Sequence, residues 1–252
     1  MGYSAILYEE KDSIGLLTLN RPQSLNAVNQ TMLEELEDLL AALASSQTCR
    51  VLIITGAGEK GFCSGLDVKE TAGELFTQPP GLIYAYQARG SRIFYNMRRI
   101  PQPVIAAING SAAGMGFSFT MAADVRIITP SARFIASYIN IGLGGADLAS
   151  SFFLPRLIGS GRANELLLTG EPMNAQEAIS LGFASRMVEK ENLLETAYGI
   201  ARTMADKNPV GLKMTKEAIN MSLDGLSLEQ AQHLENRNQA FMITAMLVPP
   251  KQ

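Results

Sequence analysis

The chain has 252 residues, of which 47% are hydrophobic and 18% are charged, with a formal net charge of −3. This length and composition are typical of one large globular domain, or of one domain with a smaller helical part, and they exclude intrinsic disorder. The charge balance offers no basic face for nucleic acid or for an anionic membrane. No apolar run reaches the ~20 residues that a membrane span needs.

Cysteine and histidine usage narrows the chemistry further. Cys49 and Cys63 are the only cysteines and form no CxxC pair, which rules out a disulfide framework or a zinc cluster. The first residues lack a basic segment followed by an apolar run, so we expect no signal peptide and a cytoplasmic protein. His233 is the single histidine, and its polar surroundings favour a surface helix position over a catalytic triad or a metal site.

The first half of the chain alternates strand and helix signals. Residues 5–8 and 14–19 predict a hairpin around the polar turn EEKDS. Thr31 is expected to cap a helix, with Glu34 completing a capping box. The apolar spacing predicts the buried stripe of that helix as Met32, Leu36, Leu39, Leu40 and Leu43. Further strands are expected over residues 51–55, 104–108, 125–129 and 133–137. Repeated strand–turn–helix units predict an α/β fold.

The last third of the chain is predicted to be helical. Asn174 and Glu177 form a capping box, Asn208-Pro209 opens another helix, and Ser227 with Gln230 caps a long final one. The apolar surface of this region exceeds what a small subdomain can bury on itself, so we expect self-association.

Residues 56–61, GAGEKG, fit the GxGxxG pattern and follow an apolar strand, which suggests dinucleotide binding. The third glycine of such a motif should lie in an opening helix, but the residues that follow, FCSG, are a poor helix start. We therefore reject a dinucleotide site here.

Two glycine-rich segments are stronger candidates for chemistry. Residues 61–70 (GFCSGLDVKE) and 108–127 (INGSAAGMGFSFTMAADVRI) each follow a strand, and a helix is expected to begin near Gly114. A turn that exposes one backbone N–H beside a helix N-terminus that offers another can hold an anion, and two converging donors can stabilise a thioester enolate. Taken alone, each segment is more often just a tight turn.

Five ordered stretches resemble the enoyl-CoA hydratase/isomerase (crotonase) superfamily. They are residues 19–28, 61–70, 103–127, 154–188 and 208–220. The resemblance implies a spiral of stacked ββα turns that binds an acyl-CoA substrate, with coenzyme A as part of the thioester and no other cofactor or metal. It also implies a core over residues 1–190 and a helical region over residues 191–252 that assembles a homotrimer or a dimer of trimers.

Matching residue by residue, the resemblance implies an oxyanion hole made by the backbone N–H groups of Leu66 and Met115. The implied CoA site comprises Asn26, Ala27, Ser64, Gly65, Leu66 and Asp67, with Gly114 at the helix start. Glycine is common in the family where this chain has Met115, so its side chain is expected to point away from the thioester. Core filling is an alternative role for the side chains of Leu66 and Met115.

Two positions depart from the family pattern. Ser118 and Tyr138 stand where hydratases carry two glutamates, so hydration by a pair of acids is not expected. Ser118 either holds a water molecule or fills space on its helix. Asp147 follows the loop GLGGA, where loss of solvation would raise the pKa of its carboxyl into the range of a general base. Capping the next helix, or pairing with Arg156, are alternative roles for Asp147.

The leading hypothesis is an enoyl-CoA isomerase or hydratase of fatty-acid or related acyl-CoA metabolism, with Asp147 as proton carrier. A non-catalytic acyl-CoA-binding relative is a second. A hydrolase or dehalogenase with Asp147 as nucleophile is a third, although a single histidine leaves it without an obvious base. Residues 83–97 show no pattern from which the acyl group could be inferred.

Overall fold

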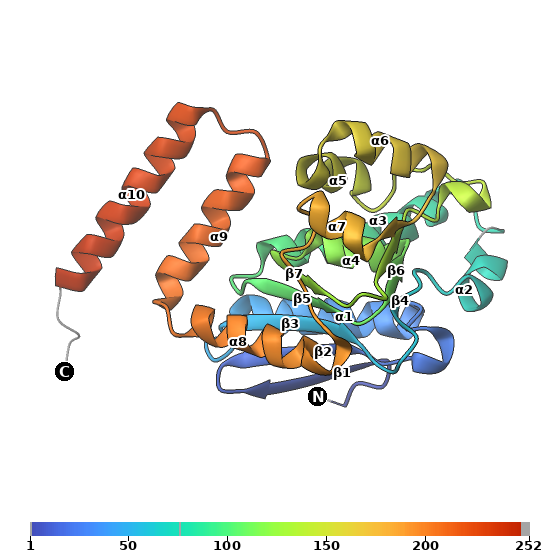
Figure 1. Cartoon of the computed structure of the whole chain (residues 1–252), viewed down its shortest axis with the longest axis horizontal. Coiled ribbons are helices and arrows are strands. Elements are labelled where there is room, and N and C mark those ends of the chain that lie inside the picture. The colour runs from blue at the N-terminus through green and yellow to red at the C-terminus, as the bar shows by residue number, and fades with distance from the viewer. Residues whose placement is uncertain (1, 76, 248–252) are drawn as a thin grey trace.

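Two β-sheets form the framework of the computed structural model, which describes residues 2–75 and 77–247 (Figure 1). The larger sheet has the order β1-β2-β3-β5-β7-β10. Its strands are β1 (Ile6–Lys11), β2 (Ile14–Leu19), β3 (Val51–Gly56), β5 (Val104–Ile108), β7 (Val125–Ile128) and β10 (Arg186–Met187). The β1–β2 hairpin is antiparallel and turns at Asp12 and Ser13, whose φ angles are 53° and 62°. The other pairs are parallel.

A smaller sheet takes alternate strands from the same part of the chain, in the order β4-β6-β8-β9. It contains β4 (Gly61–Cys63), β6 (Ser111–Ala113), β8 (Arg133–Ile135) and β9 (Met173–Asn174). The pairs β3–β4, β5–β6 and β7–β8 therefore each place one strand in either sheet and are followed by a helix. This repetition confirms the predicted spiral of stacked ββα turns.

The described residues form ten α-helices. They are α1 (Gln30–Ser45), α2 (Val68–Leu75), α3 (Pro80–Arg99), α4 (Met115–Ala122), α5 (Ser150–Ile158), α6 (Ser160–Thr169), α7 (Ala175–Ser180), α8 (Leu193–Ala205), α9 (Pro209–Leu223) and α10 (Leu228–Leu247). Short 3-10 helices lie at Pro22–Ser24, Ile139–Ile141 and Lys190–Asn192. None of the described helices combines the length and the apolar character needed to cross a membrane.

Strand β3 shows why the larger sheet is covered on both faces. All of its residues are buried, and successive side chains point to opposite sides. Val51 and Ile53 pack with one face of α8, whereas Leu52 and Ile54 belong to the main core with α1, α3 and α4. A continuous apolar run therefore marks a strand that lies between two helical layers.

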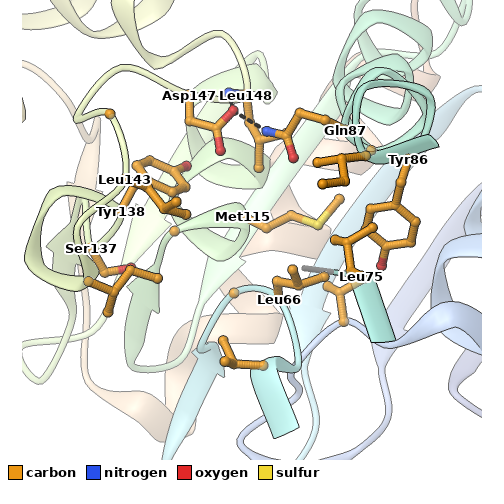
Figure 2. Close-up of a pocket in the computed structure, with 18 of the residues that line it drawn as sticks. Leu66, Leu75, Tyr86, Gln87, Met115, Ser137, Tyr138, Leu143, Asp147 and Leu148 are labelled. Carbon is orange, nitrogen blue, oxygen red and sulfur yellow. Dashed lines mark hydrogen bonds between the residues drawn. The ribbon is translucent and has the colours of Figure 1, made fainter. Parts of the chain in front are cut away.

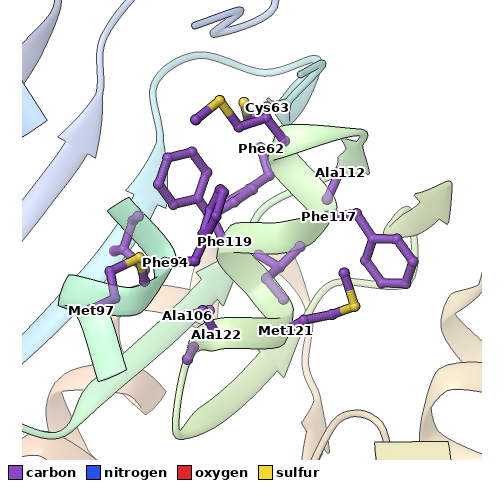
Figure 3. Close-up of a cluster of buried hydrophobic side chains, with 14 of the residues drawn as sticks. Phe62, Cys63, Phe94, Met97, Ala106, Ala112, Phe117, Phe119, Met121 and Ala122 are labelled. Carbon is purple, nitrogen blue, oxygen red and sulfur yellow. The ribbon is translucent and has the colours of Figure 1, made fainter. Parts of the chain in front are cut away.

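Helix α4 lies inside the main core and is buried at every residue (Figure 3). Its Phe119 packs edge-on against Phe94 of α3, with 5.0 Å between the ring centroids. Phe117 packs on the other side against Phe134 and Phe183. Because aromatic side chains fill the space on both sides, they hold the first residue of α4, Met115, in one place.

The predicted helix caps are confirmed in three cases and wrong in one. The side chain of Asn174 accepts the Glu177 N–H at 2.9 Å. Asn208 caps α9, and Ser227 and Gln230 cap α10 reciprocally. The first helix is capped by Asn29, which accepts the Met32 N–H at 3.0 Å, and not by Thr31. The predicted stripe of α1 is buried as expected.

The C-terminal helices divide into two kinds. Helix α8 packs on the larger sheet, whereas α9 and α10 extend away from the body of the molecule (Figure 1). Lys216 anchors α9, because its buried ammonium donates to the carbonyls of Met97 and Gln102 at 3.0 and 2.7 Å. It also lies 3.2 Å from the carboxylate of Asp124. The predicted boundary at residue 190 and the predicted trimer stay predictions.

Candidate active site

A cavity of about 660 Å³ opens between α3, the loop after β4, the start of α4 and residues 137–148 (Figure 2). Its lining is mostly apolar. The apolar side chains include those of Val28, Leu33, Leu66, Leu75, Ile83, Met115, Leu143 and Leu148. Mostly apolar cavities of this size, with a few polar groups, are typical of small-molecule sites.

Leu66 lies in the loop after β4, and its backbone N–H points away from Val28, the residue that binds this loop. Val28 donates its N–H to the Gly65 carbonyl at 2.7 Å and accepts the Asp67 N–H at 2.9 Å, which forms a parallel bridge between Val28 and Leu66. In such a bridge, the N–H of the residue between the two bonds points away from the partner strand. Within the described residues the Leu66 N–H makes no hydrogen bond, and Leu66 lines the cavity.

Helix α4 begins where a second loop meets the first. Met115 is its first residue, so its N–H has no partner within the helix. Gly114 precedes it with a φ of 51°, a conformation that favours glycine. A Cβ added to Gly65 would lie 3.4 Å from the Met115 nitrogen, and one added to Gly116 would lie 2.1 Å from the Cys63 carbonyl oxygen. The two loops thus pack backbone to backbone. The N–H groups of Leu66 and Met115 have no hydrogen-bond partner within the described residues, and both residues line one cavity.

Asp147 is the only carboxylate residue among the described residues that line the cavity. Its Oδ1 accepts the Leu148 N–H at 2.7 Å and a second hydrogen bond from the side-chain amide of Gln87 on α3 (Figure 2). Burial raises the pKa of the Asp147 carboxyl, and the two donors oppose that shift only in part. The other oxygen, Oδ2, makes no hydrogen bond within the described residues.

The backbone after Asp147 is strained. Leu148 and Ala149 have φ angles of 46° and 66°, a left-handed conformation that costs a non-glycine residue about 1–2 kcal/mol. Such strain concentrates at functional sites, where the surrounding structure holds it in place. The two alternative roles predicted for Asp147 are wrong: α5 has no side-chain cap, and Arg156 donates to main-chain carbonyls instead.

Ser118 and Tyr138 lie together at one end of the site. Both are buried, and their hydroxyl oxygens are 3.1 Å apart. Tyr138 lines the cavity, whereas Ser118 lies behind it on α4. Burial raises the pKa of the Tyr138 hydroxyl above its ordinary value, so this group stays protonated at neutral pH. The pair therefore offers neutral hydroxyl groups and no second base.

The residues predicted to line the CoA site fall into two groups. Ser64, Gly65, Leu66 and Gly114 line the cavity. Asn26, Ala27 and Asp67 are not among its lining residues, and their contacts are with the protein itself.

Arg21 and Asp67 form a buried ion pair beneath the first loop, with 2.7 Å between Nη1 and Oδ2. Burial raises the pKa of Asp67, but the hydrogen bond and charge of the Arg21 guanidinium, together with the backbone N–H groups of Glu70 and Lys69, outweigh it and hold the pKa below the usual value. The same guanidinium donates to the Ala27 carbonyl at 2.7 Å, and Asp67 also accepts the Glu70 N–H at the start of α2. Asp67 therefore supports the loop that carries Leu66.

Sequence reasoning missed Gln87 and the helix that carries it. Residues 83–97 form most of α3, which supplies one wall of the cavity through Ile83, Tyr86, Gln87 and Gly90. These residues are three or four positions apart and continue into the buried Ile93, Phe94 and Met97. That helical spacing was a usable signal for a wall-forming helix. No local signal pairs Gln87 with Asp147, 60 residues away.

A spiral of ββα turns around a cavity with two free main-chain donors is the architecture of crotonase-type, acyl-CoA-processing enzymes. Comparison with known proteins agrees. The family model described as "Enoyl-CoA hydratase/isomerase" matches residues 9–246. The "Probable enoyl-CoA hydratase echA12" of Mycobacterium leprae is 39% identical over 236 residues, which cover 92% of this chain and 80% of that protein. The 1,2-epoxyphenylacetyl-CoA isomerase of Escherichia coli is 34% identical over 215 residues, with coverages of 85% and 81%.

A solved structure shows the same fold. The crystal structure of an enoyl-CoA hydratase from Bacillus anthracis superposes with a TM-score of 0.87 at 33% identity, covering 96% of this chain and 92% of that one. This chain belongs to the enoyl-CoA hydratase/isomerase family. It is an acyl-CoA-processing enzyme of that family.

Proposed function

We propose that this enzyme is an enoyl-CoA isomerase in which Asp147 moves a proton along the acyl chain. The backbone N–H groups of Leu66 and Met115 would hold the thioester oxygen and stabilise the enolate. The observation that carries the proposal is that, among the described residues, the cavity has one carboxylate in its lining and two main-chain N–H donors without a hydrogen-bond partner.

In the proposed reaction one residue, Asp147, both removes the proton and returns it. The Asp147 carboxylate removes a proton from the α-carbon of a 3-enoyl thioester, and the electron pair delocalises onto the thioester oxygen as a dienolate. The resulting carboxylic acid returns the proton to the γ-carbon, which leaves the 2-enoyl thioester and an ionised Asp147. No cofactor is required beyond the coenzyme A of the substrate itself.

The environment of Asp147 suits this shuttle. Burial raises the pKa of the carboxyl, which makes the carboxylate a stronger base. Gln87 and Leu148 both bind Oδ1, and this leaves Oδ2 as the atom available to the substrate. A base held by two donors is oriented before the substrate arrives, which lowers the entropic cost of proton transfer.

Hydration is a second candidate because the Tyr138 hydroxyl lies in the cavity lining, 3.1 Å from the Ser118 hydroxyl behind it. A water molecule bound to the Tyr138 hydroxyl could add to the β-carbon, with Asp147 as the base that activates it. This route uses the same enolate and the same two main-chain donors, so only the product distinguishes it from isomerisation.

The test is NMR analysis of products formed from a 3-enoyl-CoA and from a 2-enoyl-CoA in deuterated water. Isomerisation of the 3-enoyl-CoA that retains protium at the γ-carbon, because Asp147 returns the proton it removed, and no 3-hydroxyacyl-CoA, is expected. Asp147→Asn should reduce turnover by about 10³-fold or more, yet leave binding of a saturated acyl-CoA within a few-fold. Asp206→Asn, at the exposed end of α8, is the matched control and should behave as the wild type.

Three results would count against the proposal. A fully active Asp147→Asn variant would remove Asp147 from the mechanism. Formation of 3-hydroxyacyl-CoA as the main product would favour the hydratase. A covalent acyl or alkyl adduct on Asp147, found by mass spectrometry, would favour a hydrolase or dehalogenase.

We also propose that the chain assembles as a homotrimer or a dimer of trimers in the cytoplasm. The support is α10, which contacts α9 but leaves large apolar side chains exposed, among them Leu228, Phe241 and Ile243. Light scattering on the purified protein tests the assembly, and a monomer at micromolar concentration would contradict it.

A further inference from the structure

Gly90 lies in the interior of α3, where glycine is an unfavourable residue. Glycine destabilises a helix relative to alanine because it loses more backbone freedom on folding. Its φ is not positive, so the backbone does not demand glycine here. Gly90 is buried and lines the cavity. A reason for glycine must therefore come from its surroundings.

Packing against other backbone segments does not supply that reason. A Cβ added to Gly90 would meet only Met115 Cε at 3.7 Å and Leu148 Cδ2 at 3.8 Å, which are ordinary contacts with the ends of two side chains. By contrast, a Cβ at Gly116 would lie 2.1 Å from a carbonyl oxygen. Alanine would fit at position 90 without a clash, so the protein carries glycine where folding favours a larger residue.

The two side chains that a Cβ would touch both line the cavity. Gly90 also lies one helical turn after Gln87, the residue that binds Asp147. The space that the missing side chain leaves is therefore next to the carboxylate that acts on the acyl chain. Figure 2 shows Met115 between Asp147 on one side and Leu75 and Tyr86 on the other.

We propose that Gly90 determines acyl-chain specificity, because its missing side chain lets an uncharged apolar chain pass Met115 and Leu148 into the far end of the cavity. This inference rests on the proposed function, since it takes Asp147 to mark the reacting carbons. Leu75 and Tyr86 lie across Met115 from Asp147 (Figure 2), and no lysine, arginine or histidine lies among the described lining residues. The substrate class is thus a medium- or long-chain acyl-CoA, and a four-carbon acyl group would leave this part of the cavity unfilled.

The experiment measures binding separately from turnover. Isothermal titration with butanoyl-, octanoyl- and dodecanoyl-CoA, which cannot isomerise, is performed on the wild type, Gly90→Ala and Gly90→Leu. The wild type should bind dodecanoyl-CoA at least about tenfold more tightly than butanoyl-CoA. Gly90→Leu should lose most of that preference and keep its butanoyl-CoA affinity within about threefold, and Gly90→Ala should lie between them.

Gly161→Ala in α6 is the matched control, because a Cβ there meets nothing within 4 Å. Both alanine variants should raise the Tm, and only the one at position 90 should change chain-length preference. An unchanged preference in folded Gly90→Ala and Gly90→Leu, or equal wild-type affinities for butanoyl- and dodecanoyl-CoA, would overturn the inference. These results do not depend on Asp147, so a failure of the proposed isomerase reaction would be seen separately, in the product analysis.

Discussion

Asn26 was assigned to the CoA site by resemblance, yet its contacts predict a different phenotype on substitution. Its side chain is fully buried and accepts the Arg21 N–H at 3.0 Å. Its amide nitrogen lies 2.9, 3.2 and 3.1 Å from the carbonyl oxygens of Ala57, Gly61 and Phe62. One amide thus holds the turn after β2 against the β3–β4 connection.

The magnitude follows from these bonds. Asn26→Ala removes one acceptor and two N–H donors, each worth about 1 kcal/mol, and leaves buried backbone groups unpaired. The residue also has a φ of 56°, a left-handed conformation that asparagine tolerates better than alanine. We expect the free energy of unfolding to fall by about 4 kcal/mol. For a chain of this size that lowers the Tm by roughly 10 °C.

Urea unfolding and calorimetry measure the effect, and Asn29→Ala is the control in the same segment. Asn29 caps α1 with one bond of 3.0 Å, so its loss should cost only about 1 kcal/mol. If Asn26→Ala proves as stable as the wild type but loses CoA-ester binding, the reasoning from its contacts is refuted. Asn26 would then act on the ligand directly.

Three further predictions concern the site and its supports. Gly116→Ala should destabilise the fold by several kcal/mol in urea unfolding, because its Cβ would lie 2.1 Å from the Cys63 carbonyl oxygen. Gly161→Ala is the control and should be neutral or stabilising. Gln87→Leu removes a hydrogen-bond donor that lowers the pKa of Asp147, so the pKa of Asp147 should rise. The acidic limb of the kcat/KM profile, where the carboxylate forms, should then move to higher pH. A limb at the wild-type pH would contradict this. Burial raises the pKa of the Cys63 thiol to about 12, so it should react with a disulfide reagent at pH 8 only after unfolding, and rapid native labelling would contradict this.

Local signals in the sequence were sufficient for much of the fold. The caps at Asn174 and Asn208 depend on residues two or three positions away, and both were predicted correctly. Rejection of GAGEKG as a dinucleotide loop also held, because β4 follows it where a helix would be required. These features depend only on residues close by in the sequence, so they can be predicted from a single sequence.

The cap of α1 shows where local reasoning fails. Asn29 and Thr31 are both good capping residues, and each has a possible partner three residues later. The choice between them is made by the bridge between Val28 and Leu66, which keeps the chain extended through Val28 so that the helix starts directly afterwards. A contact across 38 positions is invisible to a motif, and the same contact positions the N–H of Leu66.

The candidate site itself has this long-range character, so the resemblance alone does not separate the residues that line the cavity from the residues that support them. A motif identifies residues that occur together, whether they touch the substrate or support the residues that do. Burial separates the two roles. The polar side-chain atoms of Asn26 and Asp67 bond to the protein, whereas Leu66 and Met115 line the cavity with an N–H that has no partner in the described part of the chain. An unpaired donor at a cavity is costly unless a ligand satisfies it. The free main-chain N–H groups are therefore stronger evidence for the site than the side chains that the motif contains.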